Sequence, residues 1–134
     1  MSLPSLLVTG ASGFIGRHVV AAFQRHFRVH AFGRRTAAEA RAPEGPNITW
    51  HQVDLGVPET MDAVFKRIAD DGGIDAVLHL AAHYDFAGHD DPEYQRTNID
   101  GLKAVLERSR ALKPKLFIFA SSLAMPLMPK GPCN

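Results

Sequence analysis

Three glycines, each three residues from the next, stand near the start of the chain, in the segment Thr9-Gly10-Ala11-Ser12-Gly13-Phe14-Ile15-Gly16. A short apolar run, residues 6–8, precedes this segment, and apolar residues at helical spacing follow it as far as Phe23. A glycine-rich turn between a strand and a helix suits phosphate binding, because the helix N-terminus presents free N–H groups and a positive dipole end to an anion. The same spacing fits an ordinary strand–turn–helix connection, so it needs support from the rest of the chain.

A second group that could do chemistry is Gly33-Arg34-Arg35, which follows a strand predicted over residues 27–32. Many NAD sites carry an Asp or Glu there, which hydrogen-bonds the ribose 2′-OH. Here that position is Gly33, and no acid follows until Glu39. A guanidinium can bind a 2′-phosphate through two hydrogen bonds, whereas a carboxylate would repel it. The arginines favour NADP(H) over NAD(H), with a merely solvated charge pair as the alternative.

The elements that must position these groups alternate along the chain. Apolar patterning predicts strands over residues 6–9, 27–32, 47–53, 74–80 and 116–120, and helices over residues 14–26, 58–71 and 92–112. Such alternation is typical of the α/β class. Right-handed crossovers then give a Rossmann-type doubly wound parallel sheet of about five strands in the order 3-2-1-4-5, with ligands at the carboxyl ends of the strands.

Three finer expectations concern burial and loops. The strand over residues 116–120 is nearly continuously apolar and is expected to be buried on both faces. The helix over residues 92–112 is expected to bury one apolar stripe, formed by Ile99, Leu102, Val105 and Leu106. Residues 36–46 have no apolar face and are expected to form a loop with room for one helical turn.

Composition sets the broad class. The chain has 134 residues, enough for one domain with a sizeable core, and its net charge of +1 favours neither a nucleic-acid nor a membrane-surface partner. The single cysteine, Cys133, cannot form an internal disulfide, so a cytoplasmic protein is expected. No apolar run approaches the roughly 18 residues that span a bilayer. No metal site is expected.

The glycine segment, ending in Gly-Phe-Ile-Gly, resembles the nucleotide-binding motif of the short-chain dehydrogenase/reductase superfamily. Its extended branch contains sugar-nucleotide epimerases, dehydratases and NADPH-dependent reductases. The resemblance implies that Asp54 and Leu55 hold the adenine, and that small residues pass against the ribose and phosphates after the fourth strand. The implied cofactor-binding residues are Gly10, Ser12, Gly13, Phe14, Ile15, Gly16, Arg34, Arg35, Asp54, Leu55, Ala81, Ala82 and His83.

Two further residues carry the implied catalysis. Asn98 lies inside the predicted helix over residues 92–112, where Asn is a poor helix former and often has a specific hydrogen-bonding role. The resemblance implies that Asn98 supports the backbone of the site and a proton-relay water. Ser122, at the end of the fifth strand, is implied to hydrogen-bond the substrate oxygen. The alternative for the pair Ser121-Ser122 is that it simply ends a strand.

The proton-transferring Tyr-x-x-x-Lys of that family is missing from these residues. Gly88 and Asn98 stand four residues after the two tyrosines, Tyr84 and Tyr94. Residues 1–134 are therefore expected to be the NAD(P)-binding, N-terminal portion of a longer, truncated enzyme that acts on a small-molecule substrate. A non-catalytic NADP(H)-sensing module is the alternative. The bare edge of the fifth strand is expected either to pair with a second copy, which would give a homo-oligomer, or to be covered by the residues that follow it.

Overall fold

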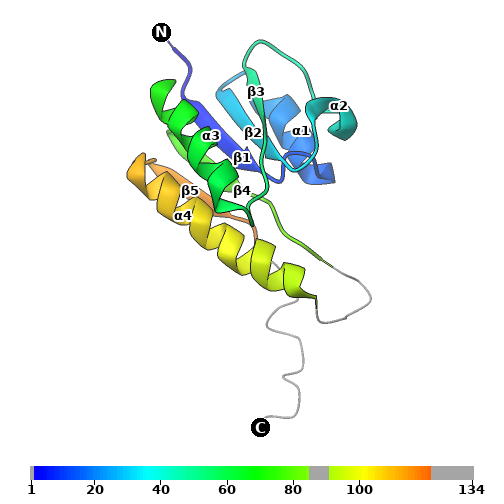
Figure 1. The fold of residues 1–134 in the computed structure, drawn as a ribbon. Coiled ribbons are helices and arrows are strands. Elements are labelled where there is room, and N and C mark those ends of the chain that lie inside the picture. The colour runs from blue at the N-terminus through cyan, green and yellow to red at the C-terminus, as the bar shows by residue number, and fades with distance from the viewer. Residues whose placement is uncertain (1, 85–90, 122–134) are drawn as a thin grey trace.

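A five-stranded parallel sheet forms the centre of the computed structural model, which describes residues 2–84 and 91–121 (Figure 1). The strand order is β3-β2-β1-β4-β5, and each neighbouring pair is parallel. The predicted order 3-2-1-4-5 is therefore confirmed. The strands are β1 (Ser5–Thr9), β2 (Arg28–Gly33), β3 (Ile48–Gln52), β4 (Ala76–His79) and β5 (Leu116–Phe119).

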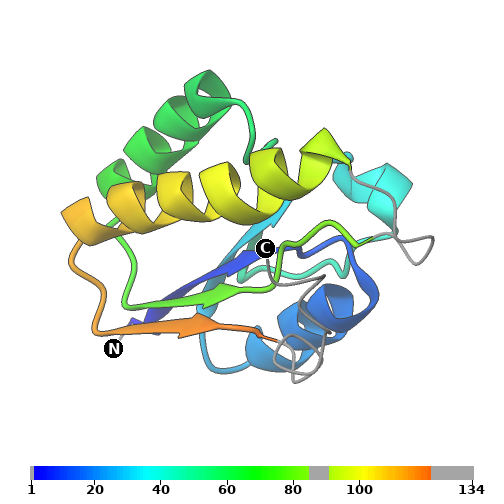
Figure 2. The ribbon, with the colours of Figure 1, turned by 90° about the horizontal axis from the view of Figure 1, so that it is seen from below.

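Helices cover both faces of this sheet. Figure 2 shows α3 and α4 together on one face and α1 on the other, which confirms the doubly wound architecture. A π-helix, η1, leads directly into α4. The short α2 is the one helical turn for which residues 36–46 had room. The helices are α1 (Phe14–Phe23), α2 (Ala37–Ala40), α3 (Pro58–Asp70), η1 (Tyr94–Gly101) and α4 (Leu102–Ala111).

Local sequence sets the ends of α3. Pro58 occupies its first turn, where the missing N–H would have no helical partner. Beyond its last turn, Gly72 and Gly73 adopt φ values of +104° and +80°, a conformation that side chains disfavour. The Gly73 N–H donates to the Ile68 carbonyl at 2.9 Å, which closes the helix end. In the described ranges, 2–84 and 91–121, no helix is long and apolar enough to cross a bilayer.

Two apolar cores, one on each face, hold the layers together. Alternation along β1 sends Leu7 toward α3 and sends Leu6 and Val8 toward α1. This is why β1 reads as a continuous apolar run. The helix α3 contributes one apolar stripe, whose four members are buried in the first core: Met61, Val64, Phe65 and Ile68.

One burial prediction was wrong, and a second was wrong in part. Leu116, Ile118 and Phe119 of β5 are about half exposed, because β5 is the sheet edge and α1 packs on β1 and β2. Of the stripe predicted over residues 92–112, Val105 is buried as expected, but Ile99 and Leu106 are 44% and 42% exposed. The other residues buried on this helix are Thr97, Gly101, Ala104 and Ser109. The hydrogen bonds of a π-helix close over five residues, so η1 shifts the phase assumed for a plain α-helix. Pairing of a second copy along the β5 edge stays a prediction.

Substitution of Ile68, which is 0% exposed in the core under α3, tests this packing. We expect Ile68→Ala to lower the free energy of unfolding by about 2–5 kcal/mol and Ile68→Val by about 0.5–1.5 kcal/mol. The cost of the lost apolar contacts adds to the cost of the cavity that each substitution leaves. Ile15→Ala on the exposed side of α1 is the control, and it should lower the free energy of unfolding by much less than Ile68→Ala does. Urea unfolding measures all three. Equal losses for Ile68→Ala and Ile15→Ala would contradict the assigned core.

Candidate functional site

A cavity of about 350 Å³ lies at the carboxyl ends of the central strands. It opens where β1 separates β2 from β4, which is the switch point at which open α/β sheets bind ligands. Its walls come from the loops after β1, β2, β3 and β4 and from η1. The lining residues are Gly10, Ser12, Gly13, Phe32, Gly33, Arg34, Arg35, Val53, Asp54, Leu55, Leu80, Ala81, Ala82, His83 and Thr97.

The glycine loop forms one wall and is closely packed. Gly10 has φ +67°, and a Cβ atom there would lie 2.7 Å from the Ala81 nitrogen. A Cβ atom on Gly16 would lie 2.1 Å from the Gly10 carbonyl oxygen, so α1 can approach the loop only at a glycine. Gly13 caps α1 without any side-chain hydrogen bond, and no acid lies in the first turn. This end of α1 therefore keeps N–H groups and a positive dipole end for an anion.

Thr9 joins the carboxyl ends of β1 and β4. Its hydroxyl oxygen accepts hydrogen bonds from the N–H groups of Leu80 (3.1 Å) and Ala81 (3.2 Å). The same oxygen lies 2.8 Å from His79 Nδ1. Because both lone pairs of this oxygen already accept from N–H groups, the hydroxyl donates its proton to an unprotonated Nδ1. Burial lowers the pKa of His79 to about 4, which keeps the ring neutral.

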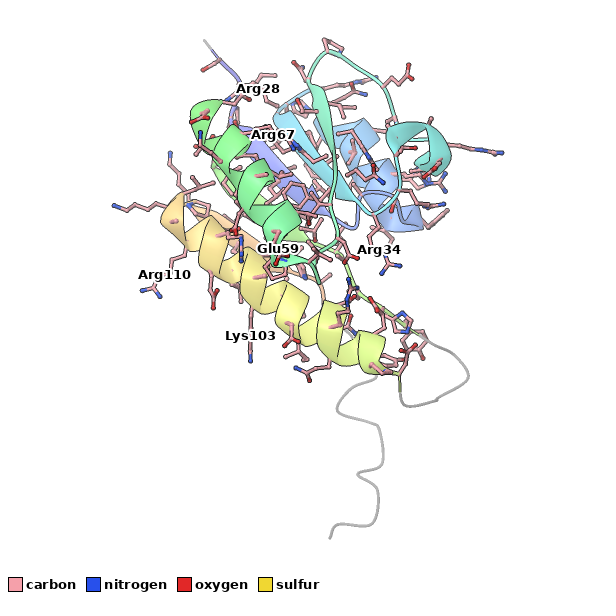
Figure 3. All side chains as sticks on the ribbon, in the orientation of Figure 1. Arg28, Arg34, Glu59, Arg67, Lys103 and Arg110 are labelled. Atoms are coloured by element: carbon pink, nitrogen blue, oxygen red, sulfur yellow. The ribbon has the colours of Figure 1, made fainter. Side chains whose placement is uncertain are left out.

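The two predicted arginines lie on the rim of the cavity, and Figure 3 labels Arg34 there. Arg35 Nη2 donates to the Ser12 carbonyl at 3.1 Å, so its guanidinium lies beside the glycine loop. The Trp50 ring Nε1 donates to the Arg35 carbonyl at 3.0 Å and holds the backbone of this turn. A Cβ atom on Gly33 would lie 2.3 Å from Trp50 Cζ2, so Trp50 leaves no space for a carboxylate side chain at Gly33.

A chain of four charges crosses the site from β3 to β2. Asp54 Oδ2 accepts from Arg96 Nη2 at 2.7 Å, Arg96 Nη1 donates to Glu93 Oε1 at 2.9 Å, and Arg34 Nη1 donates to the same oxygen at 3.1 Å. Burial raises the pKa of Asp54, but the hydrogen bonds from Arg96 and the Gly56 N–H outweigh it and lower the pKa below its ordinary value. Asp54 is therefore an anion at neutral pH.

Asn98, inside η1, braces the loop after β4. Its Oδ1 accepts from the His83 N–H at 2.6 Å, and its Nδ2 donates to the His83 carbonyl at 2.9 Å. This paired arrangement satisfies both backbone groups of His83, and it explains why an amide side chain occupies a helical position that it disfavours. The His83 ring also meets Tyr94 edge-to-face, with centroids 4.9 Å apart. Asn98 thus holds one wall of the cavity.

The structure brings most of the predicted residues together but not all of them. Phe14 and Ile15 are 73% and 64% exposed and lie outside the lining, and Gly16 packs under the loop. Asn98 acts on the cavity through His83, and Ser122 lies outside the described residues. The predicted residues that line the cavity are Gly10, Ser12, Gly13, Arg34, Arg35, Asp54, Leu55, Ala81, Ala82 and His83.

Sequence reasoning missed Glu93, Arg96 and Trp50. The spacing of Glu93, Arg96 and Thr97, three and four residues apart, indicates a helical ladder, and this signal was available. Their link to Asp54 was not, because the Arg96–Asp54 contact joins residues 42 positions apart. Gly56 makes room for it, since a Cβ atom there would lie 2.5 Å from Arg96 Cζ.

Acid should destabilise the fold through His79. Its pKa is about 6.5 in the unfolded chain and about 4 in the fold, so below pH 6.5 the unfolded chain binds the extra proton. The contribution of neutral His79 to the free energy of unfolding is fully present above pH 6.5, and it falls by as much as about 3 kcal/mol as the pH drops toward 4. Urea unfolding between pH 7.5 and 4.5 measures the slope. His79→Asn should make the slope shallower without removing it, because burial also lowers the pKa of His51 to about 4. His26→Asn, at an exposed position, should leave the slope unchanged; equal slopes in all three proteins would refute the assignment.

The sequence matches the model of the NAD dependent epimerase/dehydratase family over residues 6–130. A bifunctional dihydroflavonol 4-reductase/flavanone 4-reductase of Pyrus communis is 32% identical over 128 residues, which cover 88% of this chain and 35% of that protein. A dTDP-glucose 4,6-dehydratase of Neisseria gonorrhoeae is 33% identical over 116 residues, covering 80% of this chain and 32% of that protein. The chain thus spans about a third of the length of these relatives.

Solved structures agree with this match. The UDP-glucose 4-epimerase of Thermotoga maritima superimposes with a TM-score of 0.72 at 29% identity, covering 88% of this chain and 38% of that protein. A short-chain dehydrogenase/reductase superfamily protein of Agrobacterium tumefaciens with bound NAD gives a TM-score of 0.67 at 30% identity, with 88% and 32% covered.

The glycine loop at the switch point, the 3-2-1-4-5 sheet and these matches lead to one assignment. The chain belongs to the NAD-dependent epimerase/dehydratase family, within the extended short-chain dehydrogenase/reductase superfamily, and its family binds a nicotinamide dinucleotide.

Proposed function

We propose that this chain is the NADP(H)-binding part of a longer oxidoreductase, epimerase or dehydratase. The observation that carries the cofactor choice is the turn after β2, where Arg34 and Arg35 line the cavity and Trp50 blocks any side chain at Gly33. A 2′-phosphate would meet two guanidinium groups there and no carboxylate at the usual ribose position. The lone Cys133 supports a cytoplasmic setting within the same proposal.

The lining of the cavity suits each part of the dinucleotide. The glycine loop and the N-terminus of α1 suit the pyrophosphate, because they offer N–H groups and permit close approach. Asp54 keeps lone pairs that can accept from the adenine amino group, and the apolar Leu55 lies beside it. Ala81 and Ala82 leave space for ribose and phosphate. The nicotinamide would then supply hydride transfer at an alcohol or ketone carbon of a small-molecule substrate.

The residues of this chain would act by positioning. Asn98 holds the backbone of His83, and so fixes the loop after β4 that lines the cavity. Thr9 fixes the start of that loop at Leu80 and Ala81. In the proposal Ser122 orients the substrate oxygen. The proton would come from a Tyr with its Lys in a part of the longer protein outside these residues, since neither tyrosine here is followed by Lys at the fourth position.

A non-catalytic NADP(H)-sensing module is the second candidate, since the cavity described above would bind the cofactor without a Tyr-x-x-x-Lys. The longer gene product separates the two. A Tyr-x-x-x-Lys beyond residue 134, together with oxidation of NADPH in the presence of a carbonyl substrate, supports the enzyme. Binding of NADPH by a protein without that motif supports the sensor.

Cofactor titration tests the proposed preference. We expect NADPH to bind at least about tenfold more tightly than NADH, since hydrogen bonds between charged groups are worth about 1.5–3 kcal/mol each. The double variant Arg34→Ala/Arg35→Ala should lose most of this difference by weakening NADPH and leaving NADH within about twofold. Isothermal titration calorimetry gives both dissociation constants.

Arg110→Ala supplies the matched control, because Arg110 points away from the fold on α4 and lies outside the cavity lining (Figure 3). Combined with Lys103→Ala, at another exposed position of α4, it removes two positive charges, as the double variant does, and so corrects for the change in net charge. Comparable wild-type affinities for NADPH and NADH, or tighter NADH binding, would overturn the proposed cofactor.

A further inference from the structure

Glu93 presents one carboxylate oxygen to three donors at the edge of the cavity. Its Oε1 accepts from Arg34 Nη1 at 3.1 Å, from Arg96 Nη1 at 2.9 Å and from the Thr97 hydroxyl. The hydrogen bond from Thr97 lowers the pKa of Glu93, burial opposes this, and the Arg96 hydrogen bond adds to the lowering, so the group is an anion at neutral pH. No acid lies next to Arg34 in the sequence, and Glu93, 59 residues away along the chain, provides the carboxylate that pairs with it.

The two arginines hold Glu93 unequally. Arg96 and Thr97 lie on η1 within one turn of Glu93, and Arg96 is itself fixed by Asp54. The Arg34 side chain belongs to a loop and is 60% exposed, compared with 36% for Arg96 and 24% for Glu93. Arg34 can therefore leave by side-chain rotation, while Glu93 keeps two donors. An exposed ion pair of this kind is weak enough to exchange.

We infer that Glu93 is a specificity-determining residue that competes with the 2′-phosphate of the cofactor for the guanidinium of Arg34. The inference rests on the proposed function, because it assumes that Arg34 meets the 2′-phosphate. In the free protein the Glu93 carboxylate stands in for that phosphate. Binding of a 2′-phosphorylated nucleotide breaks the Arg34–Glu93 pair and forms an Arg34–phosphate pair, whereas a nucleotide with a 2′-OH leaves the pair intact.

This exchange of partners by Arg34 sets how strongly the site discriminates between NADPH and NADH. Every 2′-phosphate must displace one carboxylate, so the ion pair subtracts from NADPH affinity and not from NADH affinity. The neighbouring charges do not cancel this effect, since Arg96 is neutralised by Asp54 and Arg35 donates to the Ser12 carbonyl. Removing the charge of Glu93 should therefore sharpen the preference for the phosphorylated cofactor.

Glu93→Gln tests the inference, because it keeps the shape and the carbonyl acceptor for Thr97 and removes the negative charge. The probes are 2′,5′-ADP and 5′-AMP, which carry the adenosine end with and without a 2′-phosphate. We expect calorimetry to show 2′,5′-ADP binding about fivefold tighter than in wild type, the size of one exposed ion pair, and 5′-AMP binding within twofold. Glu107→Gln, on the exposed side of α4, should change neither.

A double-mutant cycle identifies the mechanism. In an Arg34→Ala background, Glu93→Gln should alter 2′,5′-ADP affinity by less than twofold, because the competed group is gone. An undiminished fivefold gain in that background would show direct repulsion between Glu93 and the phosphate, and would overturn competition. Weaker 5′-AMP binding by Glu93→Gln would also overturn it, since Glu93 would then serve the ribose.

A measurement on the unsubstituted protein covers the case in which Glu93→Gln fails to fold. The NMR signal of the Glu93 carboxyl carbon should shift on addition of 2′,5′-ADP and stay in place with 5′-AMP; no shift with 2′,5′-ADP would refute the exchange. The two proposals fail differently. If Arg34→Ala binds 2′,5′-ADP as tightly as wild type, the assignment of Arg34 to the 2′-phosphate is wrong; if only Glu93→Gln has no effect, this inference alone is wrong.

Discussion

The close contact between the loops after β1 and β4 is the constraint on which the site depends. Gly10 approaches Ala81 so nearly that one methyl group would not fit, and the Thr9 hydroxyl bonds both N–H groups of Leu80 and Ala81. These bonds satisfy backbone donors at the point where the parallel ladder of β1 and β4 ends. Because Gly10 places no side chain against Ala81, the two loops meet closely and the carboxyl edge of the sheet stays open for a ligand.

Charge arrangement then divides the cavity into regions. The glycine loop and the start of α1 carry partial positive charge and no acid. The opposite side holds two acids and two arginines in alternation, Asp54, Arg96, Glu93 and Arg34, which link the ends of β3 and β2 to the beginning of η1. A ligand that binds one of these four side chains removes an ion-pair partner from its neighbour, and so changes the charge balance of the remaining three. The side of the cavity formed by Asp54 and Arg34 is thereby coupled to the helix that holds Asn98 and the loop at His83.

Much of the fold could be predicted from patterns of two and 3.6 residues. Each of the five strands appeared either as an apolar run or as an alternation of apolar and polar residues. The alternation of strands with helices then implied the strand order, because crossovers are right-handed. Failures came where burial depends on neighbours. Leu116 and Ile118 are apolar in an edge strand and are half exposed, since α1 lies over β1 and β2. Ile99 fits an α-helical stripe but sits in a π-helix, where that period does not hold.

The sequence by itself determined the features that depend on a few adjacent residues. The glycine loop, the missing acid at Gly33 and the arginines after it all belong to this group, because backbone conformation and local charge are set by residue type and spacing. Only the tertiary structure decided which distant groups face them. It laid the start of η1 against the ends of β2 and β3, brought Glu93 within 3.1 Å of Arg34, and packed Trp50 against Gly33. Contacts over 59 and 17 positions of the chain follow from topology, which no short pattern contains.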